Sequence, residues 1–178
     1  LLRALEQLGV ETESDDGKLP ILLRGGNLHG GKVQVSGARS SQYLSSLLFL
    51  APLIGERVEI EVVDDLVSRP LVHTTLEVLQ QAGIQVEAAP DLLHFEIRGG
   101  QRYQPGEYTV NGDYPSAAAI LAAGAITHSH IAVERLFEDR QGEREAIPLL
   151  RRMGVEVEYD GREVQLRGHR GLRPVECD

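Results

Sequence analysis

Hydroxyl side chains stand at two places in the first half of the chain where a helix is expected to begin. Ser40, Ser41 and Gln42 precede an apolar run that starts at Leu44, and Ser68 opens a second, amphipathic pattern. A serine at a helix start accepts hydrogen bonds from N–H groups that lack a partner in the helix. Such N–H groups and the positive end of the helix dipole attract anions, phosphate above all. These residues therefore predict either a phosphate site or ordinary helix caps.

Four charged or amide side chains lie near helix starts and need separate readings. Arg39 and Arg69 flank the serines and could add positive charge to a phosphate site, or could be solvated surface residues. Asp113 and Gln141 precede two later helical patterns. For both of them capping is favoured over catalysis, because a side chain that accepts from nearby N–H groups is common at this position.

Two histidines form the best candidate for a metal pair. His128 and His130 are two residues apart and would face the same side of a strand. A structural zinc site needs about four ligands, and no third ligand is spaced to join these two. Surface polar residues are the favoured interpretation, so neither a metal nor another cofactor is expected.

The elements that must position these residues recur along the chain. Gly9, Gly83 and Gly154 each follow a helix end and precede an alternating strand, and they are 74 and 71 residues apart. A self-similar period of this length indicates a repeated structural unit.

Each complete unit is expected to have the order βαβαββ, from apolar periodicity and turn residues. In the first, we expect strands at residues 31–37, 57–63, 85–88 and 94–98 and helices at 40–54 and 68–81. In the second, we expect strands at residues 107–110, 130–134, 156–159 and 163–166 and helices at 115–125 and 142–153.

Composition limits the class of partner. The 178 residues are 42% apolar and 25% charged, which is typical of a globular protein. A net charge of −9 argues against nucleic acid and acidic membrane surfaces, because both need a basic patch. No signal peptide or membrane span is recognisable. The single cysteine, Cys177, fits a reducing cytosol.

Four short motifs occur in order along the chain. They are Ser40-Ser41-Gln42 with Ala51-Pro52-Leu53, Asp65-Leu66-Val67-Ser68-Arg69-Pro70, Gly112-Asp113-Tyr114-Pro115-Ser116-Ala117, and Gln141-Gly142-Glu143 with Met153-Gly154. Together they resemble the signatures of the 5-enolpyruvylshikimate-3-phosphate synthases (3-phosphoshikimate 1-carboxyvinyltransferases). Leu71 stands where that family often has Tyr, so one contact that many members have is expected to be missing.

The resemblance implies a fold and a place in a larger protein. It implies an α/β fold (α+β by some schemes) of repeated βαβαββ units, of the inside-out barrel type of enolpyruvyl transferases, with about two and a third units here. Residues 1–99 would belong to the first globular domain, residues 100–107 to a linker and residues 108–178 to the second domain. The chain, which begins without Met, would be a central fragment.

The resemblance also implies an activity. Such enzymes transfer the enolpyruvyl group of phosphoenolpyruvate to the 5-hydroxyl of shikimate 3-phosphate and release phosphate. By similarity Ser40, Ser41 and Ser68 bind the shikimate 3-phosphate, and Gln42 contacts both substrates. No catalytic residue is expected within this span, so the chain alone should be inert, whereas the full-length enzyme should be monomeric and cytoplasmic.

Two other interpretations stay open at this stage. A UDP-N-acetylglucosamine enolpyruvyl transferase would share the repeats, but it is expected to use a cysteine-bearing loop and to lack the Ser-Ser-Gln start. A non-catalytic βαβαββ scaffold that keeps its helix caps is the third possibility.

Overall fold

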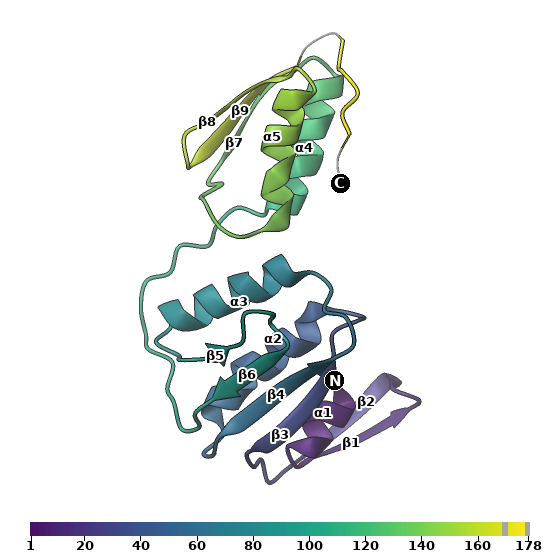
Figure 1. Cartoon of the computed structure of the whole chain (residues 1–178), viewed down its shortest axis with the longest axis vertical. Helices are drawn as coiled ribbons and strands as arrows, with labels where there is room; N and C mark the ends of the chain where they lie inside the picture. The colour runs from purple at the N-terminus through teal and green to yellow at the C-terminus, as the bar shows by residue number, and fades with distance from the viewer. Residues whose placement is uncertain (169–170, 177–178) are drawn as a thin grey trace. The chain divides into compact units, whose positions relative to one another are not determined.

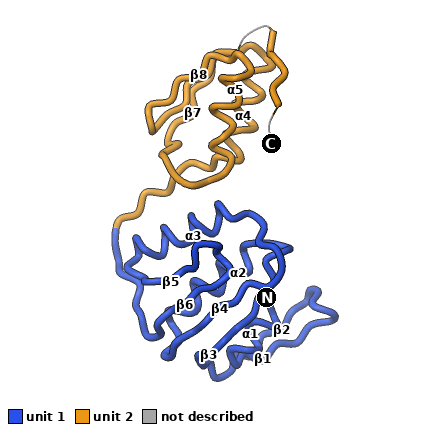
Figure 2. The backbone as a smooth tube through the Cα atoms, viewed as in Figure 1, with its two compact units in different colours: residues 1–106 blue, residues 107–178 orange. Residues whose placement is uncertain are grey.

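The computed structural model describes residues 1–168 and 171–176, so Cys177 lies outside the described residues. The chain divides into two compact units, unit 1 at Leu1–Gly106 and unit 2 at Glu107–Asp178 (Figure 2). Both units combine helices with strands (Figure 1). The mixed α/β class predicted from the sequence is confirmed.

Unit 1 contains a two-stranded ribbon and a four-stranded sheet. Its elements are α1 (Leu2–Gln7), β1 (Val10–Asp15), β2 (Lys18–Gly26), β3 (Gly31–Ser36), α2 (Ser41–Leu50), η1 (Ala51–Leu53), β4 (Val58–Val63), α3 (Arg69–Gln81), β5 (Glu87–Ala88) and β6 (His94–Ile97). The antiparallel strands β1 and β2 form the ribbon, and the sheet has the order β3-β4-β6-β5. From β3 onwards the elements follow the predicted order βαβαββ.

Two neighbouring strands of this sheet, the edge strand β3 and β4, are parallel. The pairing runs from Gly31 opposite Val58 to Ser36 opposite Val63. Alternate residues of both strands are buried, as the sequence pattern predicted; among them are Val33 and Ile60. Because β3 and β4 run in the same direction, the helices that follow them, α2 and α3, both begin at the same edge of the sheet.

Unit 2 has a smaller sheet covered by two helical segments. Its elements are α4 (Tyr114–Ile126), β7 (His130–Glu134), η2 (Gly142–Glu145), α5 (Ala146–Arg152), β8 (Glu156–Tyr159) and β9 (Glu163–Arg167). The antiparallel sheet has the order β7-β9-β8. Its core includes Tyr114, Leu121, Val164 and Leu166, all nearly inaccessible to solvent.

Two sequence-based expectations in unit 2 are wrong. Residues 107–110 were expected to form a strand, but they adopt no regular structure, and Val110 is 79% exposed. The segment buries no side chain, so nothing offsets the entropy lost on ordering it. His128 does not share a strand with His130, because it lies before β7 in a left-handed conformation (φ 55°). In unit 1, the strand expected at residues 85–88 is shorter than predicted, because only Glu87–Ala88 (β5) are in a strand.

The first part of the predicted linker is bound to unit 1. The N–H groups of Gly100 and Gln101 donate to the carbonyls of Ile54 (2.6 Å) and Pro52 (2.9 Å). The Tyr103 hydroxyl donates to the Phe49 carbonyl at 2.7 Å. These residues therefore fold with unit 1.

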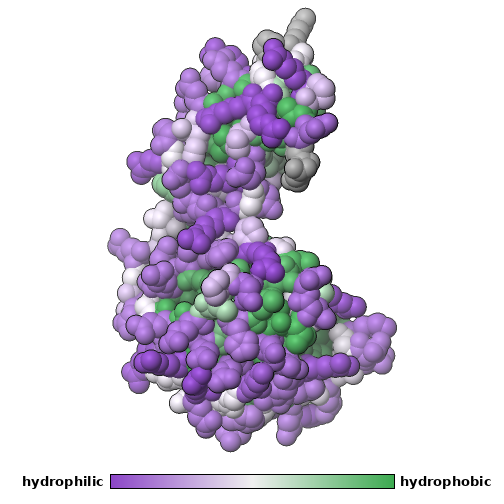
Figure 3. Space-filling view, viewed as in Figure 1, coloured by the Kyte–Doolittle hydropathy of each residue, from purple (hydrophilic) through white to green (hydrophobic). Residues whose placement is uncertain are grey.

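Apolar side chains are also exposed on both units (Figure 3). Leu19 on β2 and Ile126 on α4 are 83% and 66% exposed. Within the described residues, no helix is long and apolar enough to cross a membrane.

Candidate functional site

The start of α2 is capped by a serine, and two further polar side chains there have no hydrogen-bond partner within the described residues. The Ser40 side chain accepts from the Gln42 N–H at 3.2 Å, and its extended backbone (φ −167°) is that of an N-cap. Ser41 is only 3% exposed. Within the described residues, no fully buried side-chain oxygen lacks a hydrogen-bond partner. The Ser41 hydroxyl, which makes no side-chain hydrogen bond there, therefore keeps some contact with solvent, and the Gln42 side chain is exposed.

The start of α3 is different, because its serine does not cap the helix. Ser68 adopts a left-handed conformation (φ 54°, ψ 44°), and its exposed side chain accepts no hydrogen bond from the helix. Few non-glycine residues adopt this conformation. Pro70 in the first turn has no N–H of its own. The Ser68 hydroxyl is thus left available to a ligand.

The two loops that lead into α2 and α3 are hydrogen-bonded to each other through Gly37. Its N–H donates to the Val63 carbonyl at 3.0 Å, and its carbonyl accepts from the Val67 N–H at 3.2 Å. A Cβ added to Gly37 would lie 2.8 Å from Val62 Cγ1 and 2.9 Å from Leu66 Cα. Close backbone approach of this kind requires glycine, so Gly37 holds the helix starts together.

The helices themselves are paired by side-chain hydroxyls. Ser45 Oγ on α2 lies 2.8 Å from Thr75 Oγ1 on α3. These residues are four and six positions beyond the first residues of their helices, Ser41 and Arg69. The two helices follow parallel strands, and for roughly parallel helices a rise of about 1.5 Å per residue puts the two starts level to within about 3 Å along the axes. Ser40, Ser41, Gln42 and Ser68 are therefore gathered at one edge of one sheet, as the sequence predicted.

The two arginines beside this edge differ. Arg69 donates from Nη1 to the Asp91 carbonyl at 2.5 Å, so its guanidinium is held toward the turn before β6. Arg39 is exposed and has no partner among the described residues. The Ser36 hydroxyl donates to Asp64 Oδ2 at 2.9 Å, so it is committed to a carboxylate.

Unit 2 has helix starts at the corresponding places, and there the polar groups bond to one another. Asp113 caps α4 by accepting from the Ser116 N–H at 3.0 Å and from the Ser116 hydroxyl. The Ser116 hydroxyl bond, followed by the backbone bond, lowers the pKa of the Asp113 carboxyl from its ordinary value of 3.8. Asp113 therefore holds a negative charge at the helix end.

The Gln141 side chain links the two helix starts of unit 2. Its Oε1 accepts from the Tyr114 N–H at 3.0 Å, and its Nε2 donates to the Gly112 carbonyl at 3.2 Å and to Asp139 Oδ2 at 2.6 Å. Sequence reasoning singled out Gln141 as a cap but did not predict this bridge, because its partners are up to 29 residues away.

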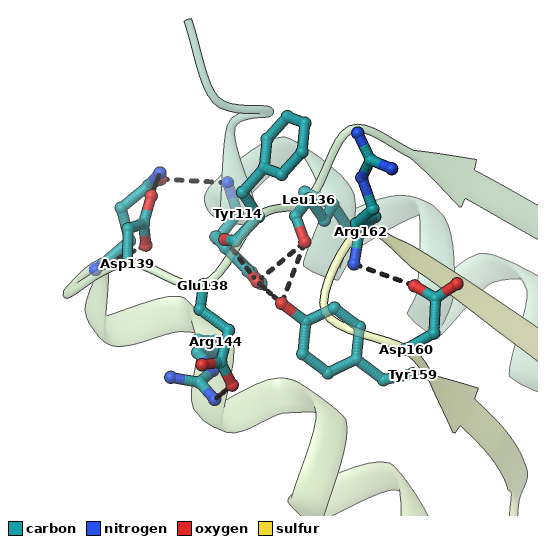
Figure 4. A network of polar contacts seen from close by, with 10 residues as sticks. Tyr114, Leu136, Glu138, Asp139, Arg144, Tyr159, Asp160 and Arg162 are labelled. Carbon is teal, nitrogen blue, oxygen red and sulfur yellow. Dashed lines mark hydrogen bonds and ion pairs between the residues drawn. The ribbon is translucent and has the colours of Figure 1, made fainter. Parts of the chain in front are cut away.

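Near the start of α4, the side chains of Tyr114 and Tyr159 form a polar network with backbone carbonyls (Figure 4). The Tyr114 hydroxyl lies 3.0 Å from the Phe137 carbonyl and 3.1 Å from the Tyr159 hydroxyl. The Tyr159 hydroxyl donates to the Leu136 carbonyl at 2.9 Å. Burial, and after it the bond to Tyr159, raises the pKa of Tyr114. Tyr114 is therefore a neutral structural anchor.

Metal binding has no support in the described residues. They contain no group of three or more His, Cys, Asp or Glu side chains that could hold an ion. His128 and His130 are both exposed.

Comparison with known proteins gives a consistent result. The model of the family EPSP synthase (3-phosphoshikimate 1-carboxyvinyltransferase) matches residues 1–178. The 3-phosphoshikimate 1-carboxyvinyltransferase of Deinococcus radiodurans is 43% identical over 179 residues, all of this chain and 40% of the relative. The enzyme of the same name from Methanocaldococcus jannaschii is 35% identical over 181 residues, all of this chain and 42% of the relative.

A solved structure supports the fold. The EPSP synthase of Acinetobacter baumannii superposes with a TM-score of 0.70 at 19% identity, over 99% of this chain and 41% of that one. The chain thus spans about two fifths of the length of the relatives that it matches.

Proposed function

The chain belongs to the EPSP synthase (3-phosphoshikimate 1-carboxyvinyltransferase) family, and on that premise we propose that it is part of an enolpyruvyl transferase of the shikimate pathway, which leads to aromatic amino acids. In this reaction the 5-hydroxyl of shikimate 3-phosphate adds to C2 of phosphoenolpyruvate and gives a tetrahedral intermediate. Loss of inorganic phosphate from that intermediate leaves the enolpyruvyl ether.

The role of this chain in the reaction is to bind the phosphate of shikimate 3-phosphate. The supporting observation is the pair of level helix starts in unit 1. Within the described residues the hydroxyls of Ser41 and Ser68 make no hydrogen bond, and the Ser40 hydroxyl, which accepts from the Gln42 N–H, keeps its proton for a ligand. Ser40, Ser41 and Ser68 supply those hydroxyls, and the first N–H groups of α2 and α3 supply further donors. A phosphate dianion accepts several such bonds and is stabilised by both helix dipoles.

The Gln42 side chain is proposed to contact both substrates. It follows the two α2 serines and is exposed beside them. An uncharged amide both donates and accepts hydrogen bonds, so it can bridge a hydroxyl of one substrate and an oxygen of the other. Arg39, which has no partner among the described residues, is proposed as an accessory cation.

We propose that the chain alone binds shikimate 3-phosphate but does not catalyse the transfer of the enolpyruvyl group. Addition to phosphoenolpyruvate needs groups that move protons and cations that hold its phosphate. The proposed site offers hydroxyls, an amide, backbone N–H groups and the accessory cation Arg39, none of which is a general acid or base near neutral pH. The finer architecture is part of the same proposal: repeated βαβαββ units, with residues 1–99 in one domain of an inside-out barrel and residues 108–178 in the other. The whole enzyme is proposed to be monomeric and cytoplasmic.

A nuclear magnetic resonance titration of the 178-residue chain with shikimate 3-phosphate tests the binding role. We expect saturable shifts of the amides of Ser41, Gln42 and Arg69 with a Kd of about 1 mM, a binding free energy of about −4 kcal/mol. The Ser116 amide in unit 2 is the internal control and should not shift. Shikimate, which lacks the phosphate, should bind at least about tenfold more weakly, since it loses several charge-assisted bonds.

Two variants separate the serines from the rest of the unit. Ser41→Ala and Ser68→Gly each delete one hydroxyl, and glycine accepts the left-handed conformation at position 68 without strain. Each should raise the Kd by about fivefold, the value of one hydrogen bond. Shifts that are absent, or that spread over unit 2, would contradict the proposal and favour a non-catalytic scaffold.

A further inference from the structure

A side-chain hydrogen bond joins α2 to α3: the hydroxyl oxygens of Ser45 and Thr75 lie 2.8 Å apart. Thr75 is 8% exposed and Ser45 is half-buried, so the bond is largely shielded from water. A polar group at such a depth is costly unless it is bonded. Its place in a helix interface therefore calls for an explanation beyond packing.

The direction of the bond follows from the proton count. The Thr75 hydroxyl donates to the Leu71 carbonyl at 2.9 Å, and a threonine has one hydroxyl proton. Ser45 must therefore donate to Thr75. The result is a continuous chain from the Ser45 hydroxyl through Thr75 to a carbonyl in the first turn of α3.

A hydrogen bond between two helices restricts their relative position more tightly than apolar packing does. Contacts between aliphatic side chains are nondirectional, and they tolerate small sliding and rotation of one helix along the other. A hydrogen bond is lost when its atoms separate by more than about half an ångström. The Ser45–Thr75 bond therefore fixes the axial position and the rotation of α3 relative to α2.

We propose that Ser45 and Thr75 are positioning residues for the phosphate site, because they hold the starts of α2 and α3 level so that their donors converge on one dianion. The inference rests on the proposed function. Neither residue touches the phosphate, since Ser45 is about 6 Å and Thr75 about 9 Å along the helix from its start. Misalignment by about 1 Å is enough to cost one or two of the bonds to the anion.

The chain contains matched controls next to each member of the pair. The Ser46 hydroxyl donates to the Gln42 carbonyl at 2.8 Å, and the Thr74 hydroxyl donates to the Pro70 carbonyl at 3.2 Å. Both are bonds to the residue four positions earlier in the same helix. Ser46→Ala and Thr74→Val therefore delete a hydroxyl on the same helices without removing a bond between them.

The test measures the Kd of the 178-residue chain for inorganic phosphate and for shikimate 3-phosphate, from the shifts of the Gln42 and Arg69 amides. Ser45→Ala and Thr75→Val should each raise both Kd values by about five- to tenfold. Ser46→Ala and Thr74→Val should stay within twofold of the wild type. Thr75→Ser, which keeps the hydroxyl, should restore binding to within twofold.

A second readout uses no ligand and tests the bond itself. In urea unfolding, the double variant Ser45→Ala with Thr75→Val should be no less stable than Thr75→Val alone, since one bond cannot be lost twice. Additive losses would overturn the bond as the link between the helices.

The two proposals fail in different ways. Wild-type binding at the expected amides, together with unchanged Kd values in Ser45→Ala and Thr75→Val, overturns the positioning role and leaves the proposed function intact. Absence of wild-type binding to either probe overturns the phosphate site, and the positioning role with it, even where the unfolding data still show a coupled pair.

Discussion

The two units place helix starts after equivalent glycines but treat the polar groups there in opposite ways. Gly37 in unit 1 and Gly112 in unit 2 each donate an N–H to a carbonyl at the end of the next strand of the sheet: Gly37 to Val63, the last residue of β4, at 3.0 Å, and Gly112 to Arg135, which directly follows β7, at 2.7 Å. Beyond Gly37, the hydroxyls of Ser41 and Ser68 are left available. Beyond Gly112, polar side chains bond to one another.

The difference shows how one local design can serve binding or stability. In unit 2 the Asp113 and Asp139 carboxylates already occupy donors at the helix starts, and a phosphate would meet two negative charges. In unit 1, the Gln42 N–H at the start of α2 is bonded to the neutral Ser40 hydroxyl and to no carboxylate within the described residues, so the helix ends keep their affinity for an anion. A phosphate site is therefore expected in the unit that leaves its own helix ends incompletely satisfied.

The largest expected effect is that of a methyl group at the shared glycine. Gly37→Ala would place a Cβ within 3.0 Å of atoms of Val62, Leu66 and Asp65, two of them backbone atoms that cannot rotate away. We expect unit 1 to lose about 2 kcal/mol of stability from this overpacking. Amide hydrogen exchange at Ile60 in β4 measures the loss, because it reports opening of unit 1 by itself.

Two further glycine variants decide whether the effect is local. Gly112→Ala meets the Arg135 carbonyl oxygen and Leu136 Cδ2, both at 2.9 Å, and should lower protection at Val164 in unit 2 while leaving unit 1 unchanged. Gly55→Ala has no neighbour within 4 Å and should change protection by less than about 0.5 kcal/mol. Equal losses in Gly37→Ala and Gly55→Ala would show that the close approach at Gly37 is unimportant.

The next effect comes from giving unit 1 the charge that unit 2 has. In Ser68→Asp the carboxylate would lie at the start of α3, where an acid stabilises the helix, and aspartate tolerates the left-handed conformation better than most residues. The fold should therefore persist. Repulsion of about 1–4 kcal/mol between unit charges at 4 Å should raise the Kd for shikimate 3-phosphate at least about fivefold.

The control for this variant is Ser68→Asn, which has nearly the same shape and no charge. It should bind within about threefold of the wild type in the same titration of the Gln42 amide. Equally tight binding by Ser68→Asp would place the phosphate away from α3 and remove the functional contrast between the units.

A smaller effect is expected when the bridge in unit 2 is removed. Gln141→Ala deletes the bonds to the Tyr114 N–H, the Gly112 carbonyl and Asp139, and the half-buried site admits water in their place. We expect unit 2 to lose about 1.5 kcal/mol, measured by hydrogen exchange at Val164. Phosphate binding should not appear there, because Asp113 and Asp139 stay in place.

Gln165→Ala is the matched control for the bridge. Gln165 is exposed on β9, and its side chain donates only to Glu163 on the same strand. Its loss should cost less than about 0.5 kcal/mol. Similar losses in Gln141→Ala and Gln165→Ala would mean that the bridge contributes nothing specific.

The sequence predicted most of the fold, because its elements depend on local signals. Apolar alternation identified β3 and β4, and a serine before an apolar run identified the start of α2. The strand expected at residues 107–110 shows where local signals are not enough. Its alternation is correct, but whether a short segment orders depends on partners and burial that the pattern does not contain.

The details of the site depend on contacts between residues distant in sequence. The Arg69 guanidinium is held by a carbonyl 22 residues away, so the sequence could not decide whether Arg69 faces a ligand. The Ser45–Thr75 bond spans 30 residues. The sequence shows two adjacent hydroxyl residues on each helix, Ser45-Ser46 and Thr74-Thr75, and does not say which of them meet. The gathering of Ser41 and Ser68 was predictable, because parallel strands bring the following helices to one edge.

The smallest effect concerns the two helix caps and acid. The Asp113 cap of α4 titrates, whereas the Ser40 cap of α2 has no ionisable group. Because the Ser116 bonds lower the pKa of Asp113 below 3.8, its contribution to stability is complete above that pH and is lost as the pH falls through the lowered value. Neutral carboxyl groups accept more weakly from N–H groups.

The amide shifts of Ser116 and Gln42 across an acid titration compare the two caps directly. The Ser116 amide should move with a midpoint below pH 3.8, and the Gln42 amide should follow no such curve. In Asp113→Asn, which keeps an acceptor oxygen without the charge, the Ser116 curve should disappear while the helix persists. A midpoint at or above 3.8 would mean that the Asp113–Ser116 bonds do not favour the charged carboxylate.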